Sequence, residues 1–343
     1  MSLPPKEIPL GAIRFNSDSQ KLEYFNGDVW MQVHTFNPNL DGGVRGIFGG
    51  GNSPNTPSCA DIEYITISTK GNANDFGDFV GNTFAQGGCG SRTRGIFGGG
   101  KYPAAHSNRI EYITFSSTGA ATDFGGDLTV GRQYVSGLSN STRGIFAGGQ
   151  ASPDIASDVI DYITMASTGV NAQDFGNLVN TIKYYAMTCA SPTRGLICSG
   201  SPSHVGNIDL ITISTLGNAT DFGETTEDHS GGQGCSNSTR GVFGGGYTPG
   251  GTIVNIIDYV QIATTGNASD FGDLTSVRRG LAACSSSLRG VWAGGCSPTD
   301  VNIIDFVTIT SRGSATDFGD LGQTNSGKLR NKAGCSNGHG GLG

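Results

Sequence analysis

Hydrophobic and polar residues alternate in short runs along most of this chain. Examples are IEYITIS (residues 62–68), IDYITMAS (160–167) and IDYVQIA (257–263), which are also rich in β-branched side chains. A period of two residues predicts β-strands, and no stretch shows a helical period of useful length. The sequence therefore predicts an all-β protein.

The strands belong to a unit of about 49 residues that occurs six times. Each copy contains an arginine-glycine strand such as RGIFGGG, an alternating strand, a DFG segment and a strand of small residues such as RGLAACSSS (279–287). Four short strands in each of six copies are typical of a β-propeller, whose four-stranded blades pack around an axis. The small-residue strand is expected to be the innermost strand.

The first copy, which begins at Arg45, has no small-residue strand before it. A surplus stretch after the sixth copy, KLRNKAGCSNGHG (328–340), has the character of the missing strand. We therefore expect the C-terminal strand to complete the first blade, because such closure removes an exposed sheet edge. The expected domains are a module over residues 1–44 and a six-bladed propeller over residues 45–343.

The glycine pair that ends GIFGGG and the tyrosine of IEYI resemble the kelch repeat, with the phenylalanine of DFG where kelch blades carry tryptophan. The resemblance implies a kelch-like β-propeller fold.

Composition narrows the function. Charged residues make up 14% of the chain, the formal net charge is −7, and no basic run occurs, so nucleic-acid binding is not expected. The start of the chain does not have the pattern of a secretion signal and no window is apolar enough to span a membrane, so a soluble, cytoplasmically made protein without membrane insertion is expected. Five of the eight cysteines occupy the same point of the repeat and none has metal-ligand spacing. We expect buried, reduced cysteines, no metal and no cofactor.

Segment lengths distinguish the two faces of the expected ring. The small-residue strand and the following arginine are always separated by the same number of residues, whereas the arginine and the next aromatic position are 16 to 19 residues apart. Binding residues usually lie on variable loops held by a rigid scaffold, so the variable face is the better candidate for binding. The candidates on it are Tyr102, His106, Tyr134, Asp154, Tyr185, His204, His229, Tyr247 and Asp300.

Arginines and aspartates recur in equal numbers on the other face. Because opposite charges at equivalent places favour structural pairs, we expect each arginine to pair with a DFG aspartate. The arginines are Arg45, Arg94, Arg143, Arg194, Arg240 and Arg289, and the aspartates are Asp75, Asp123, Asp174, Asp221, Asp270 and Asp317. No catalytic residue is predicted, since six copies of DFG without a kinase's other motifs indicate architecture.

The first 44 residues contain three predicted strands, GAIRF, KLEYF and VWMQV, the last two joined by an NGD turn. Such a short module cannot bury its own hydrophobic residues, so we expect it to attach to copies of itself or to another protein. The residues expected to make this contact are Ile13, Phe15, Leu22, Tyr24, Phe25 and Trp30.

This module resembles modules of tailed-phage fibre and appendage proteins through the phrase GAIRFNSDSQKLEYFNGDVW, and the repeat wording STGNATDFGDLT next to TRGVFGGG resembles proteins of phages of marine cyanobacteria. The resemblance implies a virion structural protein, assembled in the host cytoplasm. Its module would join other virion proteins or form a homo-oligomer, and its propeller would bind a host-surface glycan or protein. A carbohydrate-active propeller enzyme and a purely architectural decoration protein remain alternatives.

Overall fold

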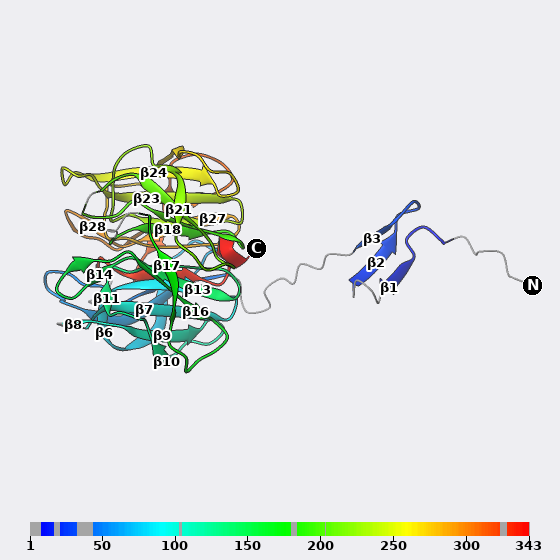
Figure 1. Ribbon diagram of the computed structural model, residues 1–343. Helices are drawn as coiled ribbons and strands as arrows, with labels where there is room; N and C mark the ends of the chain where they lie inside the picture. The colour runs from blue at the N-terminus through cyan, green and yellow to red at the C-terminus, as the bar shows by residue number, and fades with distance from the viewer. Residues whose placement is uncertain are drawn as a thin grey trace, which may run out of the picture. The chain divides into compact units, whose positions relative to one another are not determined.

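The computed structural model describes residues 8–16, 21–32, 44–102, 105–179, 184–202, 204–322 and 328–342. The chain divides into two compact units, Met1–Asp41 and Gly42–Gly343 (Figure 1). Its secondary structure over these residues is all-β apart from one 3-10 turn, η1 (Gly340–Leu342). Within the described ranges, no helix has the length and apolar character needed to cross a membrane.

The first unit is a three-stranded antiparallel sheet of β1 (Ile13–Asn16), β2 (Lys21–Phe25) and β3 (Trp30–Gln32). The predicted NGD turn joins β2 to β3: the Asn26 side-chain oxygen accepts hydrogen bonds from the backbone N–H groups of Asp28 and Val29, and Gly27 has a φ of 100°. A positive φ at this point suits glycine, which explains why the sequence turns here.

Four copies of the repeat each form a separate four-stranded antiparallel sheet with the predicted strand order. In every sheet the small-residue strand comes first, followed by the arginine-glycine strand, the alternating strand and the DFG strand. The sheets are β12 (Ser136–Ser139), β13 (Arg143–Ala147), β16 (Val159–Thr164), β17 (Gln173–Asn177); β18 (Met187–Ala190), β19 (Arg194–Cys198), β20 (Asn207–Thr212), β21 (Thr220–Glu224); β22 (Gln233–Ser236), β23 (Arg240–Tyr247), β24 (Ile253–Gln261), β25 (Ser269–Asp273); and β26 (Ala282–Ser285), β27 (Arg289–Ala293), β30 (Ile303–Thr308), β31 (Thr316–Asp320).

The first two copies share one eight-stranded sheet because β6 serves both of them. The DFG part of β6 pairs with one neighbour, and its small-residue part pairs with the other, so the two strands expected from the sequence are continuous here. At the far edge the C-terminal β32 pairs with β4, opposing Cys335 to Ile47, as the surplus stretch predicts. The strands are β4 (Arg45–Gly49), β5 (Cys59–Thr66), β6 (Asn74–Gly90), β7 (Arg94–Tyr102), β8 (Ala105–His106), β9 (Arg109–Thr114), β10 (Thr122–Asp127) and β32 (Ala333–Ser336).

Five more short strands lie in connections outside the four-strand pattern: β11 (Arg132–Gln133), β14 (Gln150–Ala151), β15 (Ile155–Ala156), β28 (Cys296–Ser297) and β29 (Thr299–Asp300). Figure 1 shows β8, β14 and β28 at the end of the second unit away from the C-terminus. We call this end, which carries the loops of variable length, the loop face.

Neighbouring copies pack their sheets against each other. One hydrophobic cluster, for example, joins Ile145 and Phe175 of the third copy to Ile197 and Ile211 of the fourth. The phenylalanines of all six DFG segments are at most 3% exposed. They are Phe76, Phe124, Phe175, Phe222, Phe271 and Phe318. The apolar residues of the DFG and alternating strands therefore form the core between copies.

A closed ring of backbone hydrogen bonds joins the six copies at one residue each. Tyr134 N–H donates to Ala85 O at 2.8 Å, and the pattern continues from copy to copy until Ala85 N–H donates to the last residue, Asn331, at 2.9 Å. All six residues have a φ between 55° and 73°. We call these six residues the collar; they are Ala85, Tyr134, Tyr185, Gly231, Gly280 and Asn331.

The six repeat arginines form a second closed series, and the expected aspartate partners are wrong. Each guanidinium instead donates to a backbone carbonyl of the next copy, from Arg45 to Phe115 O (2.6 Å) round to Arg289, which returns to Ile67 O of the first copy (2.8 Å). The other four links are Arg94 to Met165 O, Arg143 to Ile213 O, Arg194 to Ile262 O and Arg240 to Ile309 O. The DFG aspartates are exposed. Carbonyls at strand ends need a donor, and arginine supplies one without burying a second charge.

Candidate functional site

A cavity of about 240 Å³ opens on the loop face directly above the collar. Five collar residues form its floor: Tyr134, Tyr185, Gly231, Gly280 and Asn331. Its walls are formed by Asn52, Tyr247, Arg279 and Arg330. These residues come from five of the six copies. The site therefore exists only when the copies are assembled.

Two tyrosines of the collar stack on each other inside this cavity. The ring centroids of Tyr134 and Tyr185 lie 3.9 Å apart with an angle of 29° between the planes. Burial raises the pKa of both phenols, so both are neutral and able to donate and accept hydrogen bonds at neutral pH. The stack gives the cavity one aromatic wall.

Two arginines give the cavity its charge. Arg279 places its guanidinium 5.1 Å from the centre of the Tyr247 ring, and among the described residues it makes no ion pair. Arg330 has one acidic neighbour, Asp300, but the Nε–Oδ1 distance of 3.7 Å is too long for a hydrogen bond. None of the described residues that line the cavity is a carboxylate. In a chain of net charge −7, this cavity is a local positive site.

Below the collar, the space between the inner strands narrows. A cavity of about 30 Å³ there is lined by residues of all six copies, including Gln86 and Gln233. The Gln86 amide is buried, and within the described part of the chain neither its oxygen nor its nitrogen has a hydrogen-bonding partner. A ligand larger than a few atoms is therefore confined to the space above the collar.

The C-terminus occupies the opposite end of this channel. The turn η1 packs against β12, β18 and β22, and His339 Nε2 lies 2.7 Å from Gly90 O. His339 Nδ1 accepts a hydrogen bond from Gly341 N–H at 3.1 Å, so the ring is held as the neutral Nε2–H tautomer. Burial lowers the pKa of His339. The cavity at the loop face is thus the accessible end of the channel.

Of the residues predicted to bind, the structure brings Tyr134, Tyr185 and Tyr247 together in the cavity. Asp300 reaches it only through Arg330, and His204 lies beside it, with its ring 5.0 Å from that of Tyr247. These residues form one group around the cavity. Their positions in the sequence did not predict this grouping.

The remaining predicted residues lie apart from the cavity. Tyr102 donates a hydrogen bond to buried Glu111, and His106 pairs with Asp154 at 3.1 Å across two copies. His229 is fully buried, with its Nδ1 2.8 Å from Glu227 O. Their contacts are those of residues that hold loops in place.

A histidine and two serines form a hydrogen-bonded group next to the cavity. His204 Nδ1 lies 2.7 Å from Ser230 Oγ, and Ser201 Oγ lies 2.9 Å from both Ser230 Oγ and Tyr247 OH. Ser230 and Ser201 are 0% and 1% exposed, so their hydroxyl groups have no path to a substrate. Among the described residues, no group of three or more His, Cys, Asp or Glu side chains could hold a metal.

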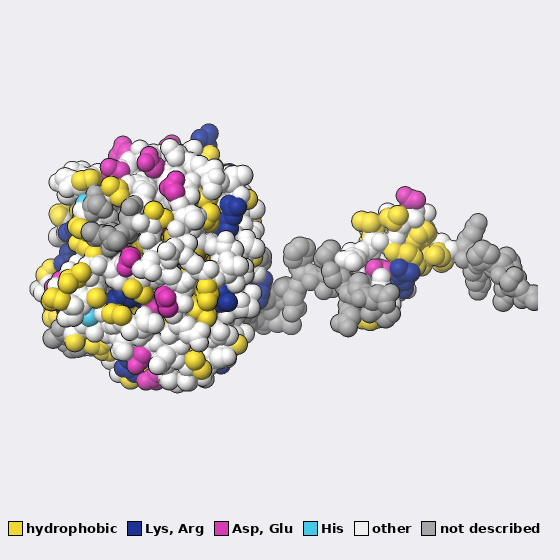
Figure 2. Space-filling model, viewed as in Figure 1, with side chains coloured by type: hydrophobic (Ala, Val, Ile, Leu, Met, Phe, Trp, Pro, Cys, Tyr) yellow, Lys and Arg dark blue, Asp and Glu magenta, His cyan; other side chains and the backbone are white. Residues whose placement is uncertain are grey.

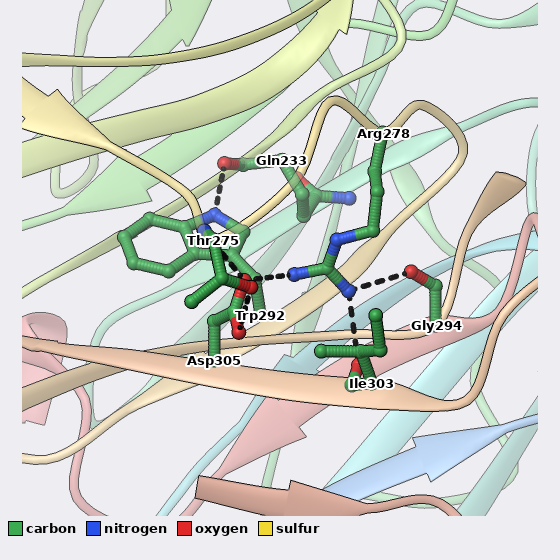
Figure 3. Close-up of polar contacts among 7 residues, drawn as sticks. All are labelled: Gln233, Thr275, Arg278, Trp292, Gly294, Ile303 and Asp305. Carbon is green, nitrogen blue, oxygen red and sulfur yellow. Dashed lines mark hydrogen bonds and ion pairs between the residues drawn. The ribbon is translucent and has the colours of Figure 1, made fainter. Parts of the chain in front are cut away.

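The sequence reasoning missed a set of acids on the alternating strands, one for each copy. In the sixth copy, Arg278 donates to Asp305 and to the carbonyls of Gly294 and Ile303 (both 2.9 Å), while Thr275 donates to Asp305 at 2.7 Å (Figure 3). The third copy repeats this arrangement with Arg132 and Asp161. The acids are Glu63, Glu111, Asp161, Asp209, Asp258 and Asp305, all at most 4% exposed. They hold the loops above the strands and do not face the cavity.

The cavity arginines and asparagines were also missed, although a signal was present. Arg279 and Arg330 each stand one residue before the collar position, as Gln133, Tyr184 and Ser230 do in other copies. Aligning the six copies at this position would have shown that its residue type varies while the neighbouring repeat positions stay the same. The chain matches no protein-family model, and no curated protein matches it significantly.

Proposed function

We propose that residues 42–343 form a six-bladed, kelch-like β-propeller closed by the C-terminal strand. Three observations support this proposal: the constant strand order of the copies, the collar and the arginine series, both of which return from the last copy to the first. The inner strands also contact one another in cyclic order, from β32 through β6, β12, β18, β22 and β26 back to β32. A ring of blades accounts for all of these contacts at once.

We further propose that the protein is a virion appendage subunit whose propeller binds a host-surface receptor. The observation that carries this proposal is the cavity above the collar, which combines aromatic, amide and guanidinium groups on the face where loop lengths vary. Concave sites with a few convergent polar groups are the usual places for ligands. The phage setting rests on the resemblance of the N-terminal module and of the repeat wording.

The N-terminal module supplies the attachment in this proposal. Ile13, Phe15, Leu22 and Tyr24 are 40% to 67% exposed, and the strand register places them with Met31 on one face of the sheet. Figure 2 shows hydrophobic side chains gathered on this unit. An exposed apolar patch of this kind marks an interaction surface.

The receptor proposal is tested by binding of the full-length protein to a glycan array and to cyanobacterial envelope preparations. Tyr247→Ala, which alters the cavity wall, should weaken binding at least tenfold. Tyr259→Ala, which removes a tyrosine of the same copy that contacts Arg240 instead, should leave binding unchanged. Binding that survives Tyr247→Ala would move the receptor site elsewhere, and no binding to any surface would favour an architectural decoration protein.

A further inference from the structure

Two arginine side chains line the cavity above the collar. Arginine donors that no carboxylate neutralises are costly to desolvate unless a ligand supplies the counter-charge. Arg279 and Arg330 both line this cavity. Among the described residues Arg279 makes no ion pair, and Arg330 has only a long ion pair with Asp300, at 3.7 Å. The planar guanidinium group grips a carboxylate through two parallel hydrogen bonds, which favours a carboxylate as the ligand group.

The rest of the cavity suits a sugar ring more than a bare ion. Tyr247 lies under the Arg279 guanidinium, and the Tyr134–Tyr185 stack forms another wall, so two flat aromatic surfaces flank the charged groups. Asn331 is held in place by its hydrogen bond to Asn52 (2.8 Å), and both residues line the cavity. Aromatic faces contact the C–H groups of a pyranose, while amides and phenols bind its hydroxyl groups.

The size of the cavity limits the ligand to the end of a chain. Its volume is about 240 Å³, and the space below the collar is far smaller, at about 40 Å³ and then 30 Å³. Arg330 also borders a wider groove of about 670 Å³ that runs between the loops 53–56 and 298–300. A ring bound above the collar could therefore continue along this groove as the remainder of a glycan.

We propose that the cavity binds the terminal acidic sugar of a glycan, with the sugar carboxylate on Arg279 and Arg330 and the ring against the tyrosines. This inference rests on the proposed receptor-binding function and names its ligand class.

The test is a titration of the full-length protein with glucuronate, glucose and acetate, followed by ligand-observed NMR. Glucuronate carries both the carboxylate and the pyranose ring, glucose only the ring and acetate only the carboxylate. Glucuronate should bind at least tenfold more tightly than either. Arg279→Gln should reduce glucuronate affinity at least tenfold, while Arg312→Gln, which removes the same charge from an exposed turn outside the cavity, should not change it. Thermal unfolding of each variant verifies that it is folded.

Other results would overturn the inference in distinguishable ways. Equal affinity for acetate and glucuronate would make this a simple anion site, and equal affinity for glucose and glucuronate would remove the role of charge. Unchanged affinity in Arg279→Gln would place the sugar elsewhere. If the protein binds neutral glycans on the array but not glucuronate, the receptor proposal stands and the acidic-sugar inference fails.

Discussion

At the scale of single residues, a cysteine-glycine contact explains two features of the composition together. A Cβ atom added to Gly241 would lie 2.4 Å from Cys189 Sγ of the preceding copy, and one added to Gly144 would lie 2.9 Å from Cys89 Sγ. The glycine after each repeat arginine meets the inner-strand residue of a neighbouring copy in this way, in cyclic order. All eight cysteines are buried and free. The glycine of the repeated Arg-Gly thus leaves space for a sulfur atom in five copies, and for the Leu138 side chain opposite Gly195.

Gly241→Ala should therefore lower the free energy of unfolding by roughly 1 to 3 kcal/mol, because the added methyl group overpacks a close contact. Cys189→Ala removes the opposing sulfur, so the double variant should recover part of this loss, and a double-mutant cycle in urea measures the recovery. Gly250→Ala is the matched control, since only Thr248 lies near its Cβ position, at 3.9 Å. Simple additivity of the two substitutions would show that the contact does not limit packing.

At the scale of elements, the strand order and the partner of the C-terminal strand could be predicted because both follow from alternation and from counting repeats. The collar could not, since Ala85, Tyr134 and Tyr185 adopt a positive φ that their residue types rarely choose. The arginine partners were wrong because equal charge counts say nothing about unsatisfied carbonyls. Only part of the cavity was predicted. Its tyrosines were chosen from loop position, whereas Arg279 and Arg330 were missed because the residue before the collar position differs in type from copy to copy.

The C-terminal segment is the element with the clearest pH dependence. Burial lowers the folded-state pKa of His339, whose two ring nitrogens are both engaged in contacts that require the neutral tautomer. The unfolded state therefore binds a proton more readily than the folded state, and stability falls as pH decreases below about 6.5. The loss continues down to the folded-state pKa and then levels off.

We expect His339→Gln to lower stability at pH 8 but to reduce the fall in stability between pH 7 and pH 5. Gln supplies a donor for Gly90 O and carries no titratable group, so the histidine contribution to the pH slope disappears. Urea unfolding at several pH values measures both effects. The unsubstituted protein, unfolded over the same pH range, is the reference. An unchanged slope in His339→Gln would assign the acid sensitivity to other groups.

At the scale of the whole molecule, the two units differ in how far their sheet edges and apolar faces are covered. Every copy of the repeat contacts the next through its collar residue, its arginine and its DFG strand. At the DFG strand of the first copy, Phe76 O accepts a hydrogen bond from Gly119 N–H of the second copy. In the same way, Phe318 O of the sixth copy accepts a hydrogen bond from Gly71 N–H of the first. The second unit, Gly42–Gly343, which we call the repeat unit, thus pairs its sheet edges within one chain. The first unit instead leaves one apolar face exposed, while its other face is occupied by Arg14, which lies 4.1 Å above Trp30 and pairs with Glu23.

This contrast predicts that the first unit, and not the repeat unit, drives self-association. Phe15→Lys places a charge in the middle of the apolar face and should convert an oligomer of the full-length protein to a monomer, because a buried unpaired lysine is costly. Leu288→Lys is the matched control, since Leu288 is 63% exposed against 65% for Phe15 but lies in the repeat unit. Sedimentation velocity over a range of concentrations distinguishes the species, and removal of residues 1–41 should likewise leave a folded monomer. If Phe15→Lys kept the oligomer while Leu288→Lys dissolved it, the association surface would belong to the repeat unit, and the apolar face would have to serve another partner.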